Sequence, residues 1–363
     1  MKKIISVLLV FLLLFSSSLS FAACREEGNK EKHPATHSKA VSYLHFNTVT
    51  ILSSYGNITK EEFNEYVKTV DEMLGYYHKL FDIYHEYSGV NNLCTINKMA
   101  GKEPVVVDEE LIDFLLYCQL LYTITNGKTN VMLGSVLSIW HDAREIADSR
   151  GGYLNSDEFP STSALLEANQ HTSIELLVIN KEEKTAYISD ADASIDVGAI
   201  AKGYAAAKAA KRLKEMGADS MALNAGGNII PIGLRPDGSN WVIGITNPDK
   251  TSGNSFACRV EIGETSLVTS GDYERYFICD GAFYHHIIDP ETLMPANYFA
   301  SVSIFTPQSG LADALSTALF CMSYEDGLSL VESLSRVIGD DVEVLWIYQD
   351  GTMKYTDGIC FVN

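Results

Sequence analysis

Several common features are scarce or missing in this sequence. Its 363 residues carry only 27 basic side chains against 47 acidic ones, and the formal net charge of -20 disfavours nucleic-acid binding. No two of its seven cysteines have the two-residue spacing of zinc knuckles and redox motifs. No apolar run reaches the roughly 20 residues that span a bilayer. The sequence shows no internal repeat and no heme or nicotinamide motif.

The N-terminus carries the most apolar run of the chain. Two lysines precede the run at 4–15, and small residues follow it, as in a signal peptide over residues 1–23. A membrane anchor is the weaker alternative because the run is short. Cys24 follows directly and resembles the lipid-modified cysteine of bacterial lipoproteins; the alternative is ordinary cleavage after Ala22. We therefore expect an exported protein that is lipid-anchored to the cell membrane and faces outside the cytoplasm.

The remaining chain divides into a tether and one domain. Residues 24–40 are polar and aperiodic, which predicts a flexible, lipid-anchored tether, and 41–363 form the domain. Helical and strand patterns mix without strict alternation, so we expect an α+β fold with mixed sheets flanked by helices. The six later cysteines are expected mostly as small core residues. Expected helices cover 59–84, 108–125 and 200–216 and begin near 312 and 325; expected strands lie at 43–53, 174–188, 220–223, 241–246, 277–279, 301–305 and 342–348.

An acid and a small-residue turn precede the clearest helix, at 200–216. Asp196 stands before Gly198 and Ala199, and Lys202 falls in the first helical turn. A helix N-terminus behind a tight turn is suited to phosphate. Taken alone, the segment fits a close strand-to-helix connection better. Lys202 favours the phosphate site, because a cation there opposes the helix dipole unless an anion lies nearby.

Paired glycines follow the next short strand. A backbone without side chains at Gly226 and Gly227 would let a flat or charged ligand approach, although a double glycine is more often a turn.

Hydroxyls, an acid and two histidines crowd into a third segment. Ser270 and Asp272 precede the adjacent His285 and His286. Neighbouring side chains in an extended segment point to opposite faces, so only one histidine can face a given site. A zinc site needs at least three ligands and is less favoured here.

A fourth segment places oxygen atoms on one helical face. Asp313 and Thr317 are four residues apart and Ser316 is adjacent, an arrangement of hard ligands that suits magnesium. The equally weighted alternative is that Asp313 caps the helix and Thr317 packs its methyl group.

These four segments, in this order, resemble the signature of the ApbE family of FAD:protein FMN transferases. The resemblance covers nearly the whole mature chain. It implies an ApbE-like, T-fold-like domain with the active site in a cleft. It also implies that Ala199 offers its carbonyl to Mg2+, with oxygens from Asp313, Ser316 and Thr317. The FAD-binding residues that the resemblance implies or suggests are Tyr84, Lys128, Thr129, Asn130, Asp196, Lys202, Gly226, Gly227, Ser270, Asp272 and Ile287.

The chain also departs from the family pattern. Asn130 replaces an acid, Asn228 stands where Gly-Gly-Asp is common, and Leu293-Met294 stand where Thr-Gly often follows. These departures concern flavin contacts and one loop, and they leave the expected metal ligands unchanged.

The resemblance implies magnesium-dependent transfer of FMN from FAD to a threonine hydroxyl, with release of AMP. The implied acceptor is a membrane-associated redox subunit with a short Ser/Thr-rich motif. His286 is our candidate for the base that activates the hydroxyl, and Asp289 is a lesser one. Two alternatives stay open: a magnesium-dependent FAD pyrophosphatase, and a flavin-binding lipoprotein without chemistry.

Overall fold

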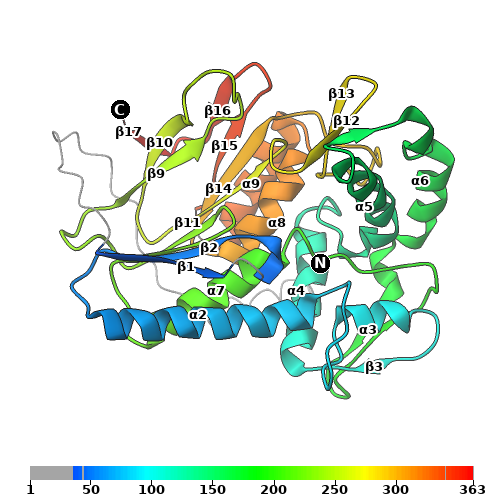
Figure 1. Cartoon of the computed structure of the whole chain (residues 1–363), viewed down its shortest axis with the longest axis horizontal. Helices are drawn as coiled ribbons and strands as arrows, with labels where there is room; N and C mark the ends of the chain where they lie inside the picture. The colour runs from blue at the N-terminus through cyan, green and yellow to red at the C-terminus, as the bar shows by residue number, and fades with distance from the viewer. Residues whose placement is uncertain (1–35, 43–44, 340, 363) are drawn as a thin grey trace.

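The computed structural model describes residues 36–42, 45–339 and 341–362. The predicted signal peptide, Cys24 and most of the predicted tether lie outside these residues. An antiparallel eight-stranded sheet forms the centre, in the order β1-β2-β7-β8-β11-β14-β15-β16 (Figure 1). Its strands are β1 (His37–Ser42), β2 (Thr50–Ser54), β7 (Met221–Ala225), β8 (Asn228–Ile232), β11 (Ser266–Gly271), β14 (Ser301–Thr306), β15 (Glu343–Ile347) and β16 (Met353–Tyr355).

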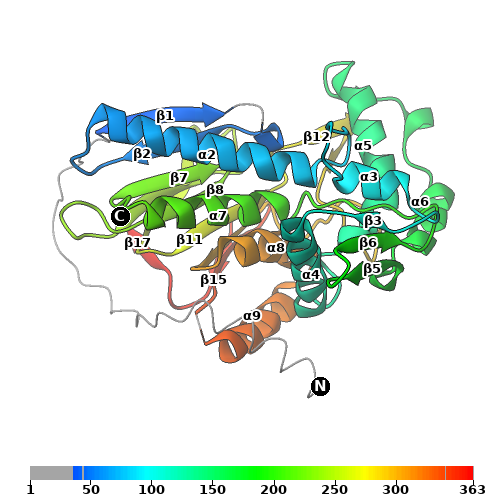
Figure 2. The same cartoon turned by 90° about the horizontal axis from the view of Figure 1, so that it is seen from below.

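Helices cover one face of this sheet, and a small sheet covers the other. Viewed from below, α2, α7 and α8 run beneath the strands (Figure 2), and α8 packs on β11 and β14. The opposite face packs through Leu267 and Leu345 against Trp241 and Val260 of the sheet β17-β10-β9. The elements named here are α2 (Lys60–Phe81), α7 (Ala201–Glu215), α8 (Ser309–Phe320), α9 (Tyr324–Ile338), β9 (Trp241–Thr246), β10 (Phe256–Ile262) and β17 (Cys360–Val362).

The remaining helices gather at one end of the molecule, at the right of Figure 1. They are accompanied by two three-stranded sheets, β3-β6-β5 and β13-β12-β4. The helices are α3 (Leu93–Lys98), α4 (Glu109–Ile124), α5 (Gly134–Asp148) and α6 (Thr162–Ala168). The strands are β3 (Val105–Val106), β4 (Tyr153–Leu154), β5 (Leu177–Asn180), β6 (Thr185–Ile188), β12 (Tyr276–Cys279) and β13 (Ala282–His285). Short 3-10 helices are η1 (His45–Asn47), η2 (Val131–Leu133), η3 (Ser156–Glu158), η4 (Asn169–His171) and η5 (Ile174–Leu176).

The structure confirms the α+β class and most of the expected elements. Thr59 caps α2 in a reciprocal pair with Glu62, and Gly217 ends the α7 segment with a φ of 90°. Two expectations at the start of the domain differ from the structure. The strand expected at 43–53 begins only at Thr50, after η1, and β1 begins at His37, inside the range expected for the tether, because it pairs with β2.

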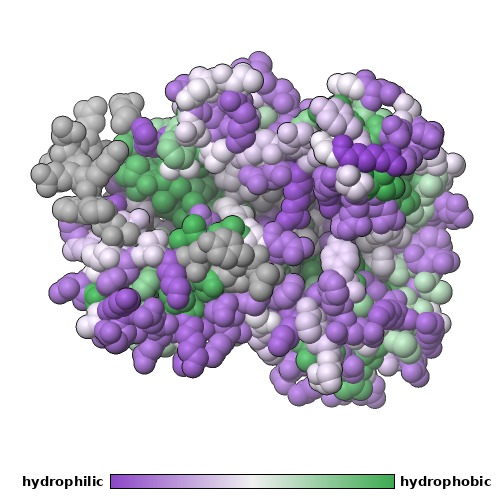
Figure 3. Space-filling model, in the orientation of Figure 1, coloured by the Kyte–Doolittle hydropathy of each residue, from purple (hydrophilic) through white to green (hydrophobic). Residues whose placement is uncertain are grey.

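The composition of the chain is reflected in its core and surface. As expected, most of the free cysteines are buried core residues: Cys94, Cys118, Cys279 and Cys321. The face shown in Figure 3 is mostly hydrophilic, with hydrophobic residues in small separate groups. Among the described helices, none has the length and apolar character to cross a bilayer.

Candidate active site

The first turn of α7 lies directly against α8. The Gly203 amide donates to Asp313 Oδ2 at 2.8 Å, and Lys202 Nζ lies 3.3 Å from Asp313 Oδ1. A Cβ on Gly203 would lie 2.6 Å from both Asp313 Cβ and the Ser309 carbonyl oxygen, so only glycine allows this approach. Asp313 stands inside α8, which begins at Ser309, and the helix-cap alternative is therefore wrong.

Several oxygen atoms gather at this junction. Ser316 Oγ is buried, lies 2.8 Å from Ser270 Oγ on β11 and donates to the Asp313 carbonyl at 2.8 Å. Thr317 is half-buried on the same helix. Among the described residues, nothing donates a hydrogen bond to the Ala199 carbonyl, because the Gly203 amide that would close the first helical turn bonds Asp313 instead. A carboxylate, hydroxyls and an unused carbonyl form a ligand set that fits Mg2+.

The turn before α7 holds Asp196 next to this junction. Asp196 Oδ1 accepts from the Gly198 amide at 2.8 Å, and the Asp196 amide donates to the Val131 carbonyl at 2.8 Å. Burial raises the pKa of Asp196, while the Gly198 amide and nearby cations act in the opposite direction. The N-cap residue, Ile200, supplies no side-chain hydrogen bond. The N-terminus of α7 therefore offers its positive end to an anionic ligand.

The ring of Tyr84 lies against α5. Its ring is 54% exposed, and its centroid lies 5.3 Å from that of His141 on α5. Burial of the hydroxyl raises the pKa of Tyr84 to about 12. The charges of Asp196 and Glu145 raise the pKa of this hydroxyl further, and those of Arg144 and Arg275 lower it.

The two adjacent histidines point to different surroundings, as expected. His285 accepts from the Ile287 amide at Nδ1, so its Nε2 carries the proton and donates to the Ala296 carbonyl at 2.6 Å. His286 has a buried Nδ1 with no hydrogen-bond partner among the described residues. Burial, followed by the charge of Arg275, lowers the pKa of His286 to about 3. His285 is therefore structural, and His286 is a neutral imidazole with a free nitrogen.

Two of the predicted site residues hold each other in place. Asp289 is only 1% exposed, and its Oδ1 lies 2.9 Å from Lys128 Nζ, which also pairs with Glu291 at 3.1 Å. Because the carboxylate of Asp289 is engaged by Lys128, Asp289 is less suited to accept a proton from the substrate than His286.

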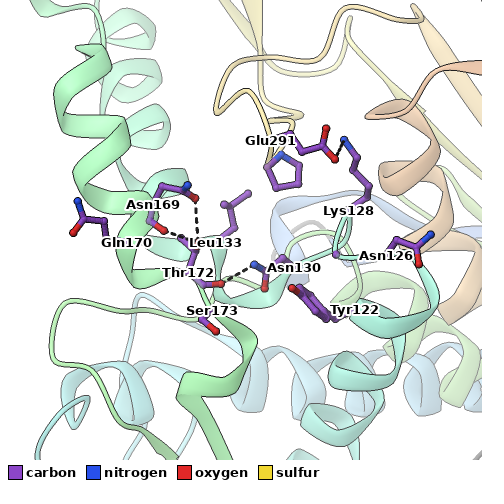
Figure 4. A pocket seen from close by; sticks show the side chains of 12 residues that line it. Tyr122, Asn126, Lys128, Asn130, Leu133, Asn169, Gln170, Thr172, Ser173 and Glu291 are labelled. Atoms are coloured by element: carbon purple, nitrogen blue, oxygen red, sulfur yellow. Dashed lines mark hydrogen bonds and ion pairs between the residues drawn. The ribbon is translucent and has the colours of Figure 1, made fainter. Parts of the chain in front are cut away.

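The neighbours of Lys128 are also engaged in the fold. Thr129 Oγ1 is buried and donates to the Ala314 carbonyl of α8 at 2.8 Å. The Asn130 side chain donates to the Thr172 carbonyl at 2.8 Å. Lys128 and Asn130 line a polar pocket of about 420 Å³ (Figure 4). A ligand contact at Lys128 and Asn130 would therefore take place in this pocket.

The paired glycines form a structural turn. Gly226 and Gly227, with φ values of 59° and 92°, make the two-residue connection between β7 and β8, as the turn alternative expects. A Cβ on Gly226 would lie 2.1 Å from Thr48 Oγ1.

Two further predicted residues belong to the core near the histidines. Asp272 is buried and accepts from Gln349 Nε2 at 2.7 Å, and burial raises its pKa. Ile287 is buried beside His285. Of the predicted residues, hydrogen bonds thus bring together Lys202, Ser270, Asp313 and Ser316.

The sequence reasoning did not select His141, Arg144 or Arg275 as site residues. His141 and Arg144 are three residues apart on one face of α5, a helix for which no pattern was recognised. Possible metal-binding clusters occur at His141, Asp142 and Glu145, and at His171, Asp190 and Asp192. Neither cluster includes the residues predicted for magnesium.

An α+β domain in which a carboxylate, hydroxyls and a carbonyl gather beside the N-terminus of a helix has an arrangement typical of enzymes that transfer phosphoryl groups. The chain belongs to the ApbE family, whose sequence model matches residues 47–339.

Curated relatives and solved structures agree with this family. The FAD:protein FMN transferase of Treponema pallidum is 34% identical over 276 residues, which cover 74% of this chain and 73% of the relative. That of Haemophilus influenzae is 26% identical over 341 residues and covers 92% and 91% of the two chains. The ApbE protein of Thermotoga maritima superposes with a TM-score of 0.73 at 26% identity, covering 88% of this chain and 97% of that one. The flavin transferase ApbE of Vibrio cholerae gives 0.70 at 26% identity, covering 89% and 97%.

Proposed function

We propose that this protein transfers FMN from FAD to a threonine hydroxyl of an acceptor redox protein, releases AMP and depends on Mg2+. The observation that carries this proposal is the junction of α7 and α8, where Asp313 and Ser316 meet a carbonyl of Ala199 that no described residue uses. The names of the curated relatives supply the flavin substrate and the protein acceptor.

The metal ligands in this proposal are Asp313, Ser316, Thr317 and the Ala199 carbonyl. These residues would hold Mg2+, which when bound would supply charge neutralisation for the pyrophosphate and polarisation of the phosphorus that bears FMN. Lys202 and the uncapped N-terminus of α7 attract the anionic substrate and position its phosphates next to these ligands.

The next step is activation of the threonine hydroxyl, which is the nucleophile. His286 is neutral, so its imidazole accepts the proton of the threonine hydroxyl as that oxygen attacks phosphorus. The new bond joins the threonine oxygen to the FMN phosphate, and the bond that breaks releases AMP.

We also place this reaction outside the cytoplasm. The lysine-flanked apolar run and Cys24 support export and lipid attachment, and the acceptor is a membrane-associated redox subunit with a Ser/Thr-rich motif.

The test is to incubate the purified protein with FAD, Mg2+ and an acceptor domain that carries such a motif, and to measure the intact mass of the acceptor and the nucleotide products. The proposal predicts an acceptor heavier by one FMN, with one AMP released. An acceptor whose threonine is replaced by alanine is the control and stays unmodified. Free FMN with an unmodified acceptor would show a pyrophosphatase, and intact bound FAD would show a carrier.

A further inference from the structure

Asn228, the first residue of β8, has a buried amide group without a partner. Its side chain is only 1% exposed, and its Nδ2 has no hydrogen-bond partner among the described residues. The side-chain NH2 group is a hydrogen-bond donor, and a buried donor that makes no hydrogen bond is costly. In contrast, the side chain of Asn224 on β7 accepts from the Gly227 amide at 3.0 Å. Asn228 therefore keeps a donor that a ligand can use.

The side chain of Asn228 lies on the face of the central sheet that carries the helices. Ile230 and Ile232 of the same strand belong to the core that α2, α7 and α8 share, whereas Ile229 packs against the small sheet on the other face. Residues two apart in a strand share a face, so Asn228 points to the helix side with Ile230. Its partner on β11, Val268, belongs to the same core.

The chain path places Asn228 near the N-terminal end of α7. A short turn joins the end of α7 to the start of β7, and α7 packs on both β7 and β8 (Figure 2). Since α7 is about 22 Å long and β7 about 17 Å, β7 runs back along most of the helix. The connection from β7 to β8 therefore lies near the first turn of α7, and Asn228 directly follows this connection.

The pairing with β11 gives the same location independently. Ser270 lies two residues beyond Val268 on the helix-facing side of β11, so it is the diagonal neighbour of Asn228 at about 7–8 Å. The Ser270 Oγ lies 2.8 Å from the Ser316 Oγ, which donates to the Asp313 carbonyl. Asn228 is thus one residue pair away from the oxygen atoms at the junction of α7 and α8.

The surroundings of the amide identify its ligand. The N-terminus of α7 has no side-chain cap and carries Lys202 in its first turn, and both features attract anions. Ser270 is half-buried and the turn at Gly226 and Gly227 is exposed, so the surface opens next to Asn228. A neutral NH2 group donates to a phosphate oxygen without charge repulsion. An aspartate, which is common at this position in the family, has the same shape but would accept instead of donate.

We propose that Asn228 is a substrate-binding residue whose Nδ2 donates a hydrogen bond to a pyrophosphate oxygen of FAD. This proposal rests on the proposed function and adds a neutral donor to the same phosphate site. It makes the affinity for the diphosphate, and not the affinity for the flavin ring, depend on residue 228.

The test compares FAD with riboflavin, which has the flavin ring but no phosphate. Binding of each to the purified full-length protein is measured by calorimetry in EDTA, so that metal binding does not contribute. Wild-type protein is expected to bind FAD at least roughly tenfold more tightly than riboflavin. Asn228→Ala removes the donor and is expected to weaken FAD binding roughly threefold to tenfold. Asn228→Asp also adds a negative charge and is expected to weaken it more than Asn228→Ala, with riboflavin binding unchanged in both variants.

The order of the two variants separates ligand contact from packing. If Asn228 only filled space, the Asp variant, which has the same shape, would bind FAD better than the Ala variant. Asn254→Asp makes the same chemical change at an exposed residue between β9 and β10 and is expected to change nothing. Thermal unfolding of each variant reports whether the fold is intact.

Three results would overturn this role of Asn228. They are equal affinity of wild-type protein for FAD and riboflavin, unchanged FAD affinity in Asn228→Asp, and an equal loss of riboflavin affinity in that variant. The transfer assay is independent of this comparison. A protein whose FAD affinity depends on Asn228 but that modifies no acceptor would refute the proposed function and support the contact. Transfer by wild-type protein, together with unchanged FAD affinity in Asn228→Asp, would refute the contact alone.

Discussion

The half-buried imidazole of His286, whose Nδ1 is buried without a partner among the described residues, makes folding stability depend on pH. Its folded pKa of about 3 lies below the ordinary value near 6.5, so between these values only the unfolded chain binds the proton. Stability therefore falls as the pH drops below 6.5. Relative to His286→Gln, wild-type protein is expected to lose about 2 kcal/mol between pH 7 and pH 5. Urea unfolding at the two pH values measures this difference, and equal losses in both proteins would show that His286 is not protected.

At the scale of single residues, the sequence allowed prediction of those site residues that lie together in one short segment. Asp313 and Ser316 are three apart on one helix, and Asp196 and Lys202 flank one turn, so local spacing was sufficient. Arg144 escaped prediction because its neighbours Tyr84 and Asp196 come from distant segments that only the fold brings together.

At the scale of elements, the contact of α7 with α8 depends on one glycine. Gly203→Ala places a Cβ 2.6 Å from the Asp313 Cβ, so the helices must separate and Asp313 must move. We expect the free energy of unfolding to fall by about 1–3 kcal/mol. We also expect a lower affinity for Mg2+, because Asp313 is one of the proposed ligands. Chemical denaturation and calorimetric Mg2+ titration measure both. Ala207→Ser, on the same helix but only half-buried, is the control, and unchanged Mg2+ affinity in Gly203→Ala would contradict this role.

The buried ion pair of Lys128 with Asp289 connects the end of α4 to the loop after β13. Lys128→Met leaves a carboxylate that is 1% exposed without its cation, and about 3 kcal/mol of stability should be lost. Lys181→Met breaks the exposed pair with Asp113 and should cost less than about 1 kcal/mol. Equal losses in the two variants, measured by urea unfolding, would show that burial adds nothing.

Elements with strong end signals were predictable, and others were not. α2 has a reciprocal cap at Thr59, whereas α5 begins after Leu133 with no side-chain cap and went unrecognised. The strand expected at 43–53 is interrupted because Phe46 and Asn47 adopt positive φ values, which periodicity does not reveal.

For the whole molecule, the location follows from the proposed lipid on Cys24. Cys24→Ser removes the thiol that would carry the lipid, and the protein is expected to move from the membrane fraction to the soluble fraction outside the cytoplasm. Fractionation with immunodetection measures this shift, and Cys258→Ser, which alters a half-buried cysteine of the domain, is the control. Persistent membrane association of the Cys24 variant would contradict the lipid anchor.

The central claim is that a metal site at the junction of α7 and α8 is needed for transfer of FMN to the acceptor. The most direct test is the rate of FMN transfer to the acceptor across a Mg2+ series for wild-type protein, Asp313→Asn and the exposed control Asp357→Asn. We predict Mg2+-dependent transfer in wild-type and control proteins, and a loss of at least roughly 100-fold in Asp313→Asn. Transfer that needs no Mg2+, or that survives in Asp313→Asn, would contradict the central claim.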